Sequence, residues 1–132
     1  MEEIWDPLRK KQVPLTPEER VRQWFIARLH TEAGIPFHMM ASEVPLRYGQ
    51  KEYRADIVVW SRRLKPAMVV ECKRPEVDLT REVLEQALNY NRVLESPYLA
   101  ITNGTRTYLA RKEGQTMTFV STWPKYEELC QL

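Results

Sequence analysis

The segment from Tyr53 to Pro75, YRADIVVWSRRLKPAMVVECKRP, is the most informative part of this 132-residue sequence. It contains two short apolar runs, at residues 53–60 and 67–73, and each predicts a strand that is buried on both faces. The first run nevertheless carries Asp56 and the second carries Glu71. Because a charge on a buried strand costs free energy unless it is paired or binds a metal, these acids indicate a functional site.

The spacing of the charges within these runs suggests their chemistry. Alternation along the second run places Glu71 and Lys73 on one face of the strand and Cys72 on the other. The two runs are joined by a short connection, so Asp56 can lie beside Glu71. Two carboxylates suit Mg²⁺ or Mn²⁺, and a neighbouring lysine could position an attacking water or stabilise a phosphate oxygen. The set predicts metal-assisted phosphodiester hydrolysis; the alternative is an ordinary ion pair between Glu71 and Lys73, with Asp56 solvated at a strand end.

Two predicted helices flank these strands and supply further polar candidates. The sequence TPEE at residues 16–19 predicts a helix start whose threonine is the N-cap and whose last residue, Glu19, completes a capping box. Glu18 falls on the core-facing stripe of this helix and is the stronger candidate for a site role. A second helix, expected over about residues 79–95, carries Gln86 in its apolar stripe. The Gln86 amide could bond to the site or, equally, to a backbone group at the core edge.

The remaining pattern predicts one mixed sheet covered by helices, an α/β fold of the α+β mixed-sheet type. The expected strands cover residues 39–46, 53–60, 67–73, 98–102, 105–111 and 116–121. Their order with the helices is α-β-β-β-α-β followed by a β-hairpin. The strands at 67–73 and 98–102 should be parallel, because a helix connects them. We expect an N-terminal arm at residues 1–15, the folded domain at 16–122, and a tail or short helix at 123–132.

The composition is typical of a single cytoplasmic domain. Hydrophobic residues make up 43% of the chain, and the formal net charge of +2 is too small to require a polyanionic partner. Cys72 and Cys130 lie far apart, with neither zinc-site spacing nor a disulfide framework, which favours a reducing compartment. The sequence contains no apolar segment long enough for a signal peptide or a membrane span, so no membrane partner is expected.

Basic side chains near the two runs are candidates for holding a phosphate backbone. Arg54 and Arg74 flank the acidic centre, and the turn between the runs adds Arg62, Arg63 and Lys65. Arginine and lysine commonly contact phosphates in nucleic-acid complexes. Charged turns are also often merely solvated, so both interpretations stay open.

At this point a family resemblance becomes visible. Asp56 followed by Glu71-Cys72-Lys73 resembles the PD-(D/E)XK nuclease superfamily, and the predicted order of elements is similar to its restriction-endonuclease-like αβββαβ core. A longer set of segments resembles the N-terminal domain of type I restriction enzyme R (HsdR) subunits, over roughly residues 14–125. These segments are TPEERVRQ at 16–23, Glu43, RAD at 54–56, VECKRP at 70–75, QALNY at 86–90 and TNG at 102–104.

The resemblance implies a Mg²⁺- or Mn²⁺-dependent DNA endonuclease. It implies that Asp56 and Glu71 bind the metal, with the backbone carbonyl of Cys72 as a candidate further ligand, and that Lys73 is the catalytic lysine. Glu18 or Glu19 would be the helix acid of such sites, and Gln86 the glutamine of the following helix.

The resemblance also implies partners. Restriction R subunits carry helicase-like motor segments after this domain, which 132 residues cannot contain, so a role in restriction would require a separate motor or specificity subunit. Cutting both strands of a duplex would favour a homodimer. The competing interpretations are a nucleic-acid-binding module of the same fold without catalysis and, more weakly, a scaffold that docks partners through its tryptophans.

Overall fold

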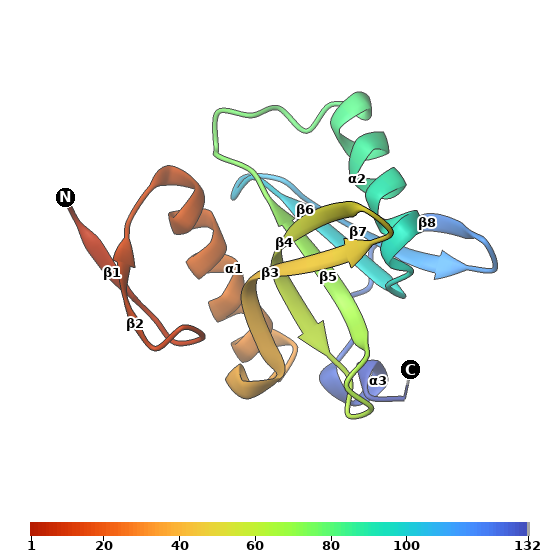
Figure 1. Cartoon of the computed structure of the whole chain (residues 1–132), viewed down its shortest axis with the longest axis horizontal. Helices are drawn as coiled ribbons and strands as arrows, with labels where there is room; N and C mark the ends of the chain where they lie inside the picture. Colours follow the sequence, from red (N-terminus) through yellow and green to blue (C-terminus); the bar gives the residue numbers. More distant parts are fainter. Residues whose placement is uncertain (132) are drawn as a thin grey trace.

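A six-stranded mixed sheet forms the centre of the molecule in the computed structural model, which describes residues 1–131, with side chains placed for all of these except Tyr48 and Val93. Its strands lie in the order β3-β4-β5-β6-β7-β8 (Figure 1). Their bounds are β3 Met40–Tyr48, β4 Lys51–Trp60, β5 Pro66–Cys72, β6 Tyr98–Thr102, β7 Thr107–Glu113 and β8 Thr116–Val120. Among the five strand pairs of this sheet only β5–β6 is parallel, as expected for two strands connected by a helix. The predicted fold class is confirmed.

Two helices cover opposite faces of this sheet (Figure 1). Helix α1, Pro17–Glu32, packs Phe25 and Leu29 against Ile57 of β4. Helix α2, Arg81–Leu94, packs on the other face, where Ala87 belongs to the same apolar cluster as Val58. Neighbouring residues of β4 therefore enter different cores, which is why its sequence is an almost continuous apolar run.

Local signals explain where the elements begin and end. The Thr80 hydroxyl accepts a hydrogen bond from the Val83 amide at 3.3 Å and caps α2. Pro45 lies in β3, an edge strand, where its missing N–H costs least. Gly114, with a φ of 65°, forms the turn between β7 and β8.

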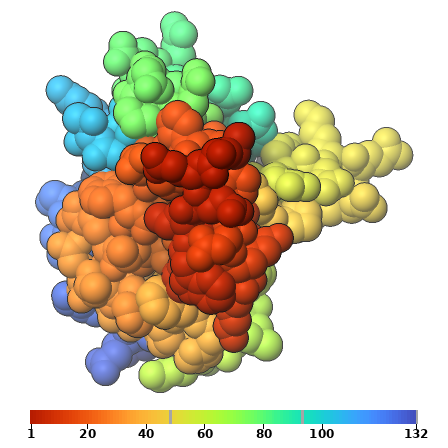
Figure 2. All heavy atoms as spheres, turned by 90° about the vertical axis from the view of Figure 1, so that its left-hand side faces the viewer, coloured from red at the N-terminus to blue at the C-terminus, as the bar shows by residue number. Residues whose placement is uncertain are grey.

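The N-terminal segment differs from the extended arm that we expected. Strands β1, Glu3–Asp6, and β2, Lys11–Pro14, form a separate antiparallel hairpin. Figure 2 shows this hairpin lying over the outside of α1, while the β3–β4 hairpin projects to one side. Asp6 is fully buried and Val13 is 3% exposed, so the hairpin packs rather than trails. Its short strands lack an apolar pattern long enough to be recognised from sequence.

The C-terminal segment contains one short helix, α3, Tyr126–Leu129, within the predicted 123–132 tail; Leu132 lies outside the described residues. A 3₁₀ turn, η1, Phe37–Met39, precedes β3. No helix among residues 1–131 is long and apolar enough to cross a bilayer.

Candidate active site

The structure brings Asp56, Glu71 and Lys73 together at one end of the β4–β5 pair. The Nζ of Lys73 lies 3.8 Å from Oε2 of Glu71, so these side chains share one face as alternation predicted. Burial, and next the charge of nearby Asp56, raises the pKa of Glu71 above its ordinary value, while Lys73 opposes this rise. The strand ends one residue before Lys73, yet its amide still donates to the Thr102 carbonyl of β6 at 2.8 Å and holds the backbone in place.

Asp56 lies where β4 departs from a regular strand. Ala55 packs in the core under α2 and Ile57 in the core under α1, although residues two apart normally face the same side. The β4–β5 ladder begins only at Ile57, and the Asp56 Oδ2 instead accepts the amide of Cys72 at 2.7 Å. Opposite Asp56 on β3, Glu43 has a φ of 51°, an uncommon conformation for a residue other than glycine. Backbone irregularity of this kind concentrates at functional sites.

Cys72 offers its backbone rather than its thiol to this site. Its side chain is 2% exposed and packs in the core under α1. Burial, with a further contribution from Asp56, raises the thiol pKa well above its ordinary value and keeps the thiol neutral. In a strand the N–H and C=O of one residue point to the same edge. Because the Cys72 amide donates to Asp56, its carbonyl also points to the Asp56 side.

The two glutamates at the start of α1 have separate tasks. The Glu19 amide donates to the Thr16 hydroxyl at 3.1 Å, which confirms Thr16 as the N-cap. The Glu19 carboxylate does not complete the predicted capping box, because it accepts from Arg9, Arg22 and Gln23 instead. Glu18 is half-exposed, and burial followed by repulsion from Asp56 raises its pKa. Glu18 is therefore the α1 acid that lies toward Asp56.

Sequence reasoning missed the arginine that joins these acids. Arg22 is 4% exposed, and its Nη2 lies 3.2 Å from Oδ1 of Asp56 and 3.3 Å from Oε1 of Glu18. Its Nη1 lies 2.8 Å from Oε1 of Glu19 and 3.6 Å from Oε1 of Glu43. The three- and four-residue spacing from Glu19 and Glu18 was the available signal, because such residues are neighbours on a helix.

The predicted phosphate-binding residues lie in different places. Arg74 is exposed and lines a groove of about 550 Å³ that Glu18, Arg22 and Glu43 also line. Arg54 is exposed on β4, two residues before Asp56. Both are placed to meet a ligand from solvent.

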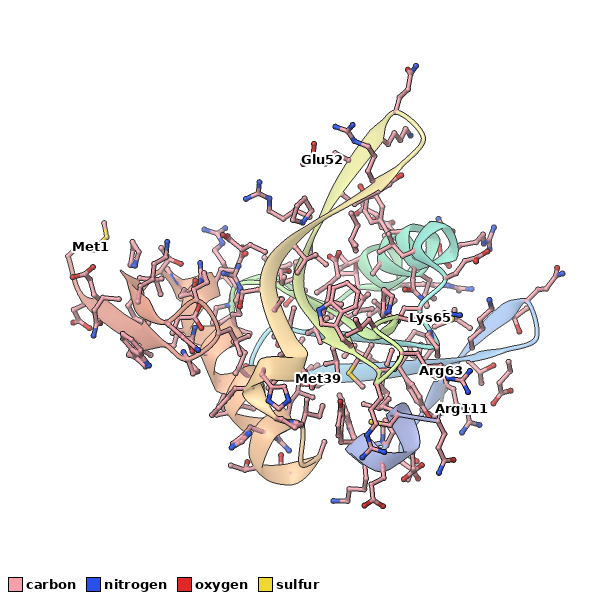
Figure 3. All side chains as sticks on the ribbon, turned by 60° about the horizontal axis from the view of Figure 1, so that its bottom comes forward. Met1, Met39, Glu52, Arg63, Lys65 and Arg111 are labelled. Atoms are coloured by element: carbon pink, nitrogen blue, oxygen red, sulfur yellow. The ribbon has the colours of Figure 1, made fainter. Side chains whose placement is uncertain are left out.

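The basic turn between β4 and β5 is not adjacent to the acidic centre, contrary to our expectation. It lies at the Trp60–Pro66 end of the ladder, whereas Asp56 lies beyond the Ile57–Val70 end. At about 3.3 Å per residue, the four residues from Trp60 to Asp56 span roughly 13 Å. Figure 3 shows Arg63 and Lys65 far from Glu52, which marks the projecting β3–β4 hairpin.

Gln86 is exposed on α2, and none of the hydrogen bonds among the described residues involves its amide. Its neighbour one turn later, Tyr90, stacks edge-on against Tyr53 of β4 with ring centroids 5.0 Å apart. The site role of Gln86 stays a prediction.

The site is strongly acidic and chemically suited to a hard cation. Six carboxylates (Asp6, Glu18, Glu19, Glu43, Asp56 and Glu71) surround three cations (Arg9, Arg22 and Lys73), which leaves a formal charge of −3 when all are ionised. Within residues 1–131, no three His, Cys, Asp or Glu side chains already form a ready set of metal ligands. The oxygen donors of Asp56, Glu71 and the Cys72 carbonyl nevertheless fit Mg²⁺ or Mn²⁺. A cation would offset the burial of Glu71 and its repulsion from Asp56, which together raise the Glu71 pKa.

Comparison with known proteins identifies the family of this chain. Residues 17–124 match the family described as the type I restriction enzyme R protein N terminus (HSDR_N). The chain belongs to this family. The HsdR-type resemblance is therefore confirmed, and the site residues predicted from the sequence, from Glu18 to Gln86, lie within the matched span. A search of curated proteins finds no match.

Two solved structures share the fold of this HSDR_N chain. One is described as a fragment of a proposed HsdR subunit of a type I restriction enzyme from Vibrio vulnificus YJ016; it has a TM-score of 0.62 and 19% identity over 89% of this chain. The chain spans 25% of that relative's length. The other is described as a proposed nuclease belonging to DUF820 from Anabaena variabilis ATCC 29413, with a TM-score of 0.55, 10% identity, and coverage of 92% of this chain and 84% of that one. The fold is thus nuclease-like.

Proposed function

We propose that this protein is a Mg²⁺- or Mn²⁺-dependent DNA endonuclease that hydrolyses phosphodiester bonds. The observation that carries the proposal is the gathering of Asp56, Glu71 and Lys73 at an irregular end of β4 and β5, in a chain of the HSDR_N family. Acids held near one another despite their repulsion are costly to the fold, and such costs concentrate where chemistry requires them.

Each residue has a task in this proposal. The Asp56 and Glu71 carboxylates and the Cys72 carbonyl would hold the cation, which when bound lowers the pKa of a water and neutralises developing negative charge. Lys73, fixed through its amide to β6, would orient the water or donate to a phosphate oxygen. Glu18 would accept hydrogen bonds from the water on the α1 side, and Gln86 would orient a group from the α2 side.

DNA is the proposed substrate. Arg74, in the groove beside Glu18, and Arg54 would hold flanking phosphates as charge partners without reading sequence. A separate motor or specificity subunit would direct the protein in a restriction role, and cutting both strands would require two copies or two successive nicks.

Lys73→Ala tests the proposed chemistry directly. Parent protein should nick or cut DNA with Mg²⁺ or Mn²⁺, and Lys73→Ala should lose this activity while keeping the parent's circular dichroism and melting temperature. Circular, linear, single-stranded and branched DNA should be assayed in parallel to define the substrate. Lys65→Ala, an exposed lysine at the other end of the strand pair, is the matched control and should cut like the parent. Equal cleavage by Lys73→Ala and parent would refute the assignment.

A second candidate function is DNA binding without catalysis. It is favoured by one observation: Arg22 already occupies Oδ1 of Asp56, an oxygen that a metal would use. A binding module should shift DNA in a gel equally in EDTA and in Mg²⁺, with affinity that falls as salt rises. Metal-dependent cleavage that is lost in Asp56→Ala would exclude this alternative.

A further inference from the structure

A series of ion pairs, Asp6–Arg9–Glu19–Arg22–Asp56, connects the N-terminal hairpin to Asp56. Asp6 accepts from Nε of Arg9, and Nη2 of Arg9 lies 2.7 Å from Oε1 of Glu19. The same oxygen of Glu19 lies 2.8 Å from Nη1 of Arg22, whose Nη2 reaches Asp56. Figure 2 shows the hairpin lying over α1, the helix that carries Glu19 and Arg22. The hairpin precedes residue 17, where the family match begins.

Three residues of this ion-pair series are nearly inaccessible to solvent. Asp6, Glu19 and Arg22 are 0%, 6% and 4% exposed. Apolar residues often replace buried ion pairs without loss of stability, so an ion-pair series is not needed merely to attach the hairpin. What it supplies is orientation, because each guanidinium fixes two or more carboxylates at once.

Arg9 links the ion-pair series to the hairpin. Its own position is fixed by Asp6, whose Oδ1 also accepts the Leu8 amide at 2.9 Å. Arg9 additionally places Nη1 3.4 Å from Oε2 of Glu43, the residue with positive φ opposite Asp56. It thus contacts acids from α1 and β3 without contacting Asp56 itself.

We propose that Arg9 is a positioning residue, which fixes Glu19 and through it Arg22, so that Asp56 is held in the orientation that binds a divalent cation. This inference deepens the proposed function and rests on it for the identity of the ligand. It also makes the hairpin at residues 1–15 part of the catalytic apparatus rather than an attachment to it.

The proposal predicts an effect opposite to that of simple electrostatics. Arg9 is a cation, so removing it should strengthen binding of another cation if charge alone matters. If Arg9 acts by positioning, Arg9→Gln should weaken binding of Mn²⁺ or Mg²⁺ to the DNA-free protein by about tenfold or more, the usual effect of losing an outer support of a metal site. Isothermal titration with each metal alone measures this, and unchanged or tighter binding by Arg9→Gln would overturn the proposal.

Amide hydrogen exchange tests the positioning role without any metal. The Cys72 amide is bonded to the Asp56 side chain, whereas the next amide, Lys73, is bonded to the Thr102 backbone. In Arg9→Gln the exchange rate of Cys72 should rise roughly tenfold relative to that of Lys73, because the Asp56 acceptor is less well held. Global destabilisation would accelerate both amides alike, and an unchanged ratio would contradict the proposal.

Two further variants complete the experiment. Arg9→Lys keeps the positive charge but loses the planar guanidinium group. Its metal affinity and its Cys72 to Lys73 exchange ratio should therefore lie between those of the parent and of Arg9→Gln. Arg28→Gln removes an exposed arginine of α1 that pairs with Glu32, and it should match the parent in both assays. If the parent binds neither metal, the proposed metal site fails, while the Cys72 to Lys73 exchange ratio still decides the role of Arg9.

Discussion

At the scale of single residues, this protein holds carboxylates in surroundings that resist their ionisation. Burial and the neighbouring Asp56 raise the pKa of both Glu71 and Glu18. By contrast Asp6, also buried, has a lowered pKa, because hydrogen bonds from Arg9 and Leu8 outweigh the cost of burial. Asp6, which is not a proposed metal ligand, is thus held in its ionised form, whereas ionisation of Glu71 and Glu18 is opposed by burial and by Asp56.

Replacing Glu71 should therefore stabilise the metal-free protein near neutral pH. A carboxylate whose pKa is raised on folding contributes stability below its ordinary pKa and loses it as pH rises through the folded value. Glu71→Gln cannot ionise, so its free energy of unfolding should exceed that of the parent at pH 7, and the difference should disappear as the pH falls toward 4. Urea unfolding in EDTA at both pH values measures this, with exposed Glu76→Gln as control. Destabilisation by Glu71→Gln at pH 7 would contradict the pKa direction.

Cys72 gives a second test at this scale. Only its backbone faces the site, so Cys72→Ala should retain cleavage and lose about 1 kcal/mol of stability through the missing buried sulfur. The native thiol should also resist modification by a thiol reagent until the protein unfolds, because it is buried and neutral. Loss of cleavage in a folded Cys72→Ala variant would indicate that the thiol itself takes part.

At the scale of elements, two strand ends and the first turn of α1 make the site. Predictions from periodicity and turn residues matched the strands and both main helices closely, because each is a long pattern with a clear cap or turn. The hairpin β1–β2 was missed, since its strands have four residues each and depend on packing against α1. The irregularity of β4 at Asp56 could not be predicted from the sequence either. It arises because the Cys72 amide donates to the Asp56 side chain and not to a backbone carbonyl of β4.

The first turn of α1 depends on its cap. Thr16→Ala removes the hydroxyl that accepts the Glu19 amide and should cost about 1 kcal/mol in the free energy of unfolding. Thr31→Ala is the matched control in the same helix: its hydroxyl is exposed and bonds only to the Ala27 carbonyl, so this change should be nearly neutral. If the two variants lose the same free energy of unfolding, the Thr16 hydroxyl does not stabilise the helix as a cap.

At the scale of the whole molecule, one sheet separates two apolar cores and carries the charged site at its end. Ile57 and Val58, both 0% exposed, enter the cores on opposite faces. The buried strands hold the backbone rigid next to the acids, so their repulsion cannot be relieved by drifting apart. A cation bound between the acids, as proposed, would relieve this repulsion.

Divalent cations should accordingly stabilise the folded protein as a whole. Mg²⁺ or Mn²⁺ at about 100 times its Kd should add roughly 2.7 kcal/mol to the free energy of unfolding, because the metal binds the folded state alone. Thermal unfolding in EDTA and in increasing metal measures the shift. Asp56→Ala should show no metal-dependent shift, and a parent protein indifferent to metal would count against the proposed centre.

The sheet, the parallel β5–β6 pair and the shared face of Glu71 and Lys73 could be predicted without the structure, because hydrophobic periodicity and strand alternation are local properties. The sequence also pointed to the HSDR_N family through motifs that lie in order along the chain. The folded structure was needed to show that Glu18 rather than Glu19 lies toward Asp56, and that Arg22 and Arg9 join the acids to the N-terminal hairpin. The contacts of Arg9 with Glu19 and Glu43, and of Arg22 with Asp56, join residues that are 10 to 34 positions apart and come from separate elements, so packing sets these distances and they leave no periodic trace in the sequence.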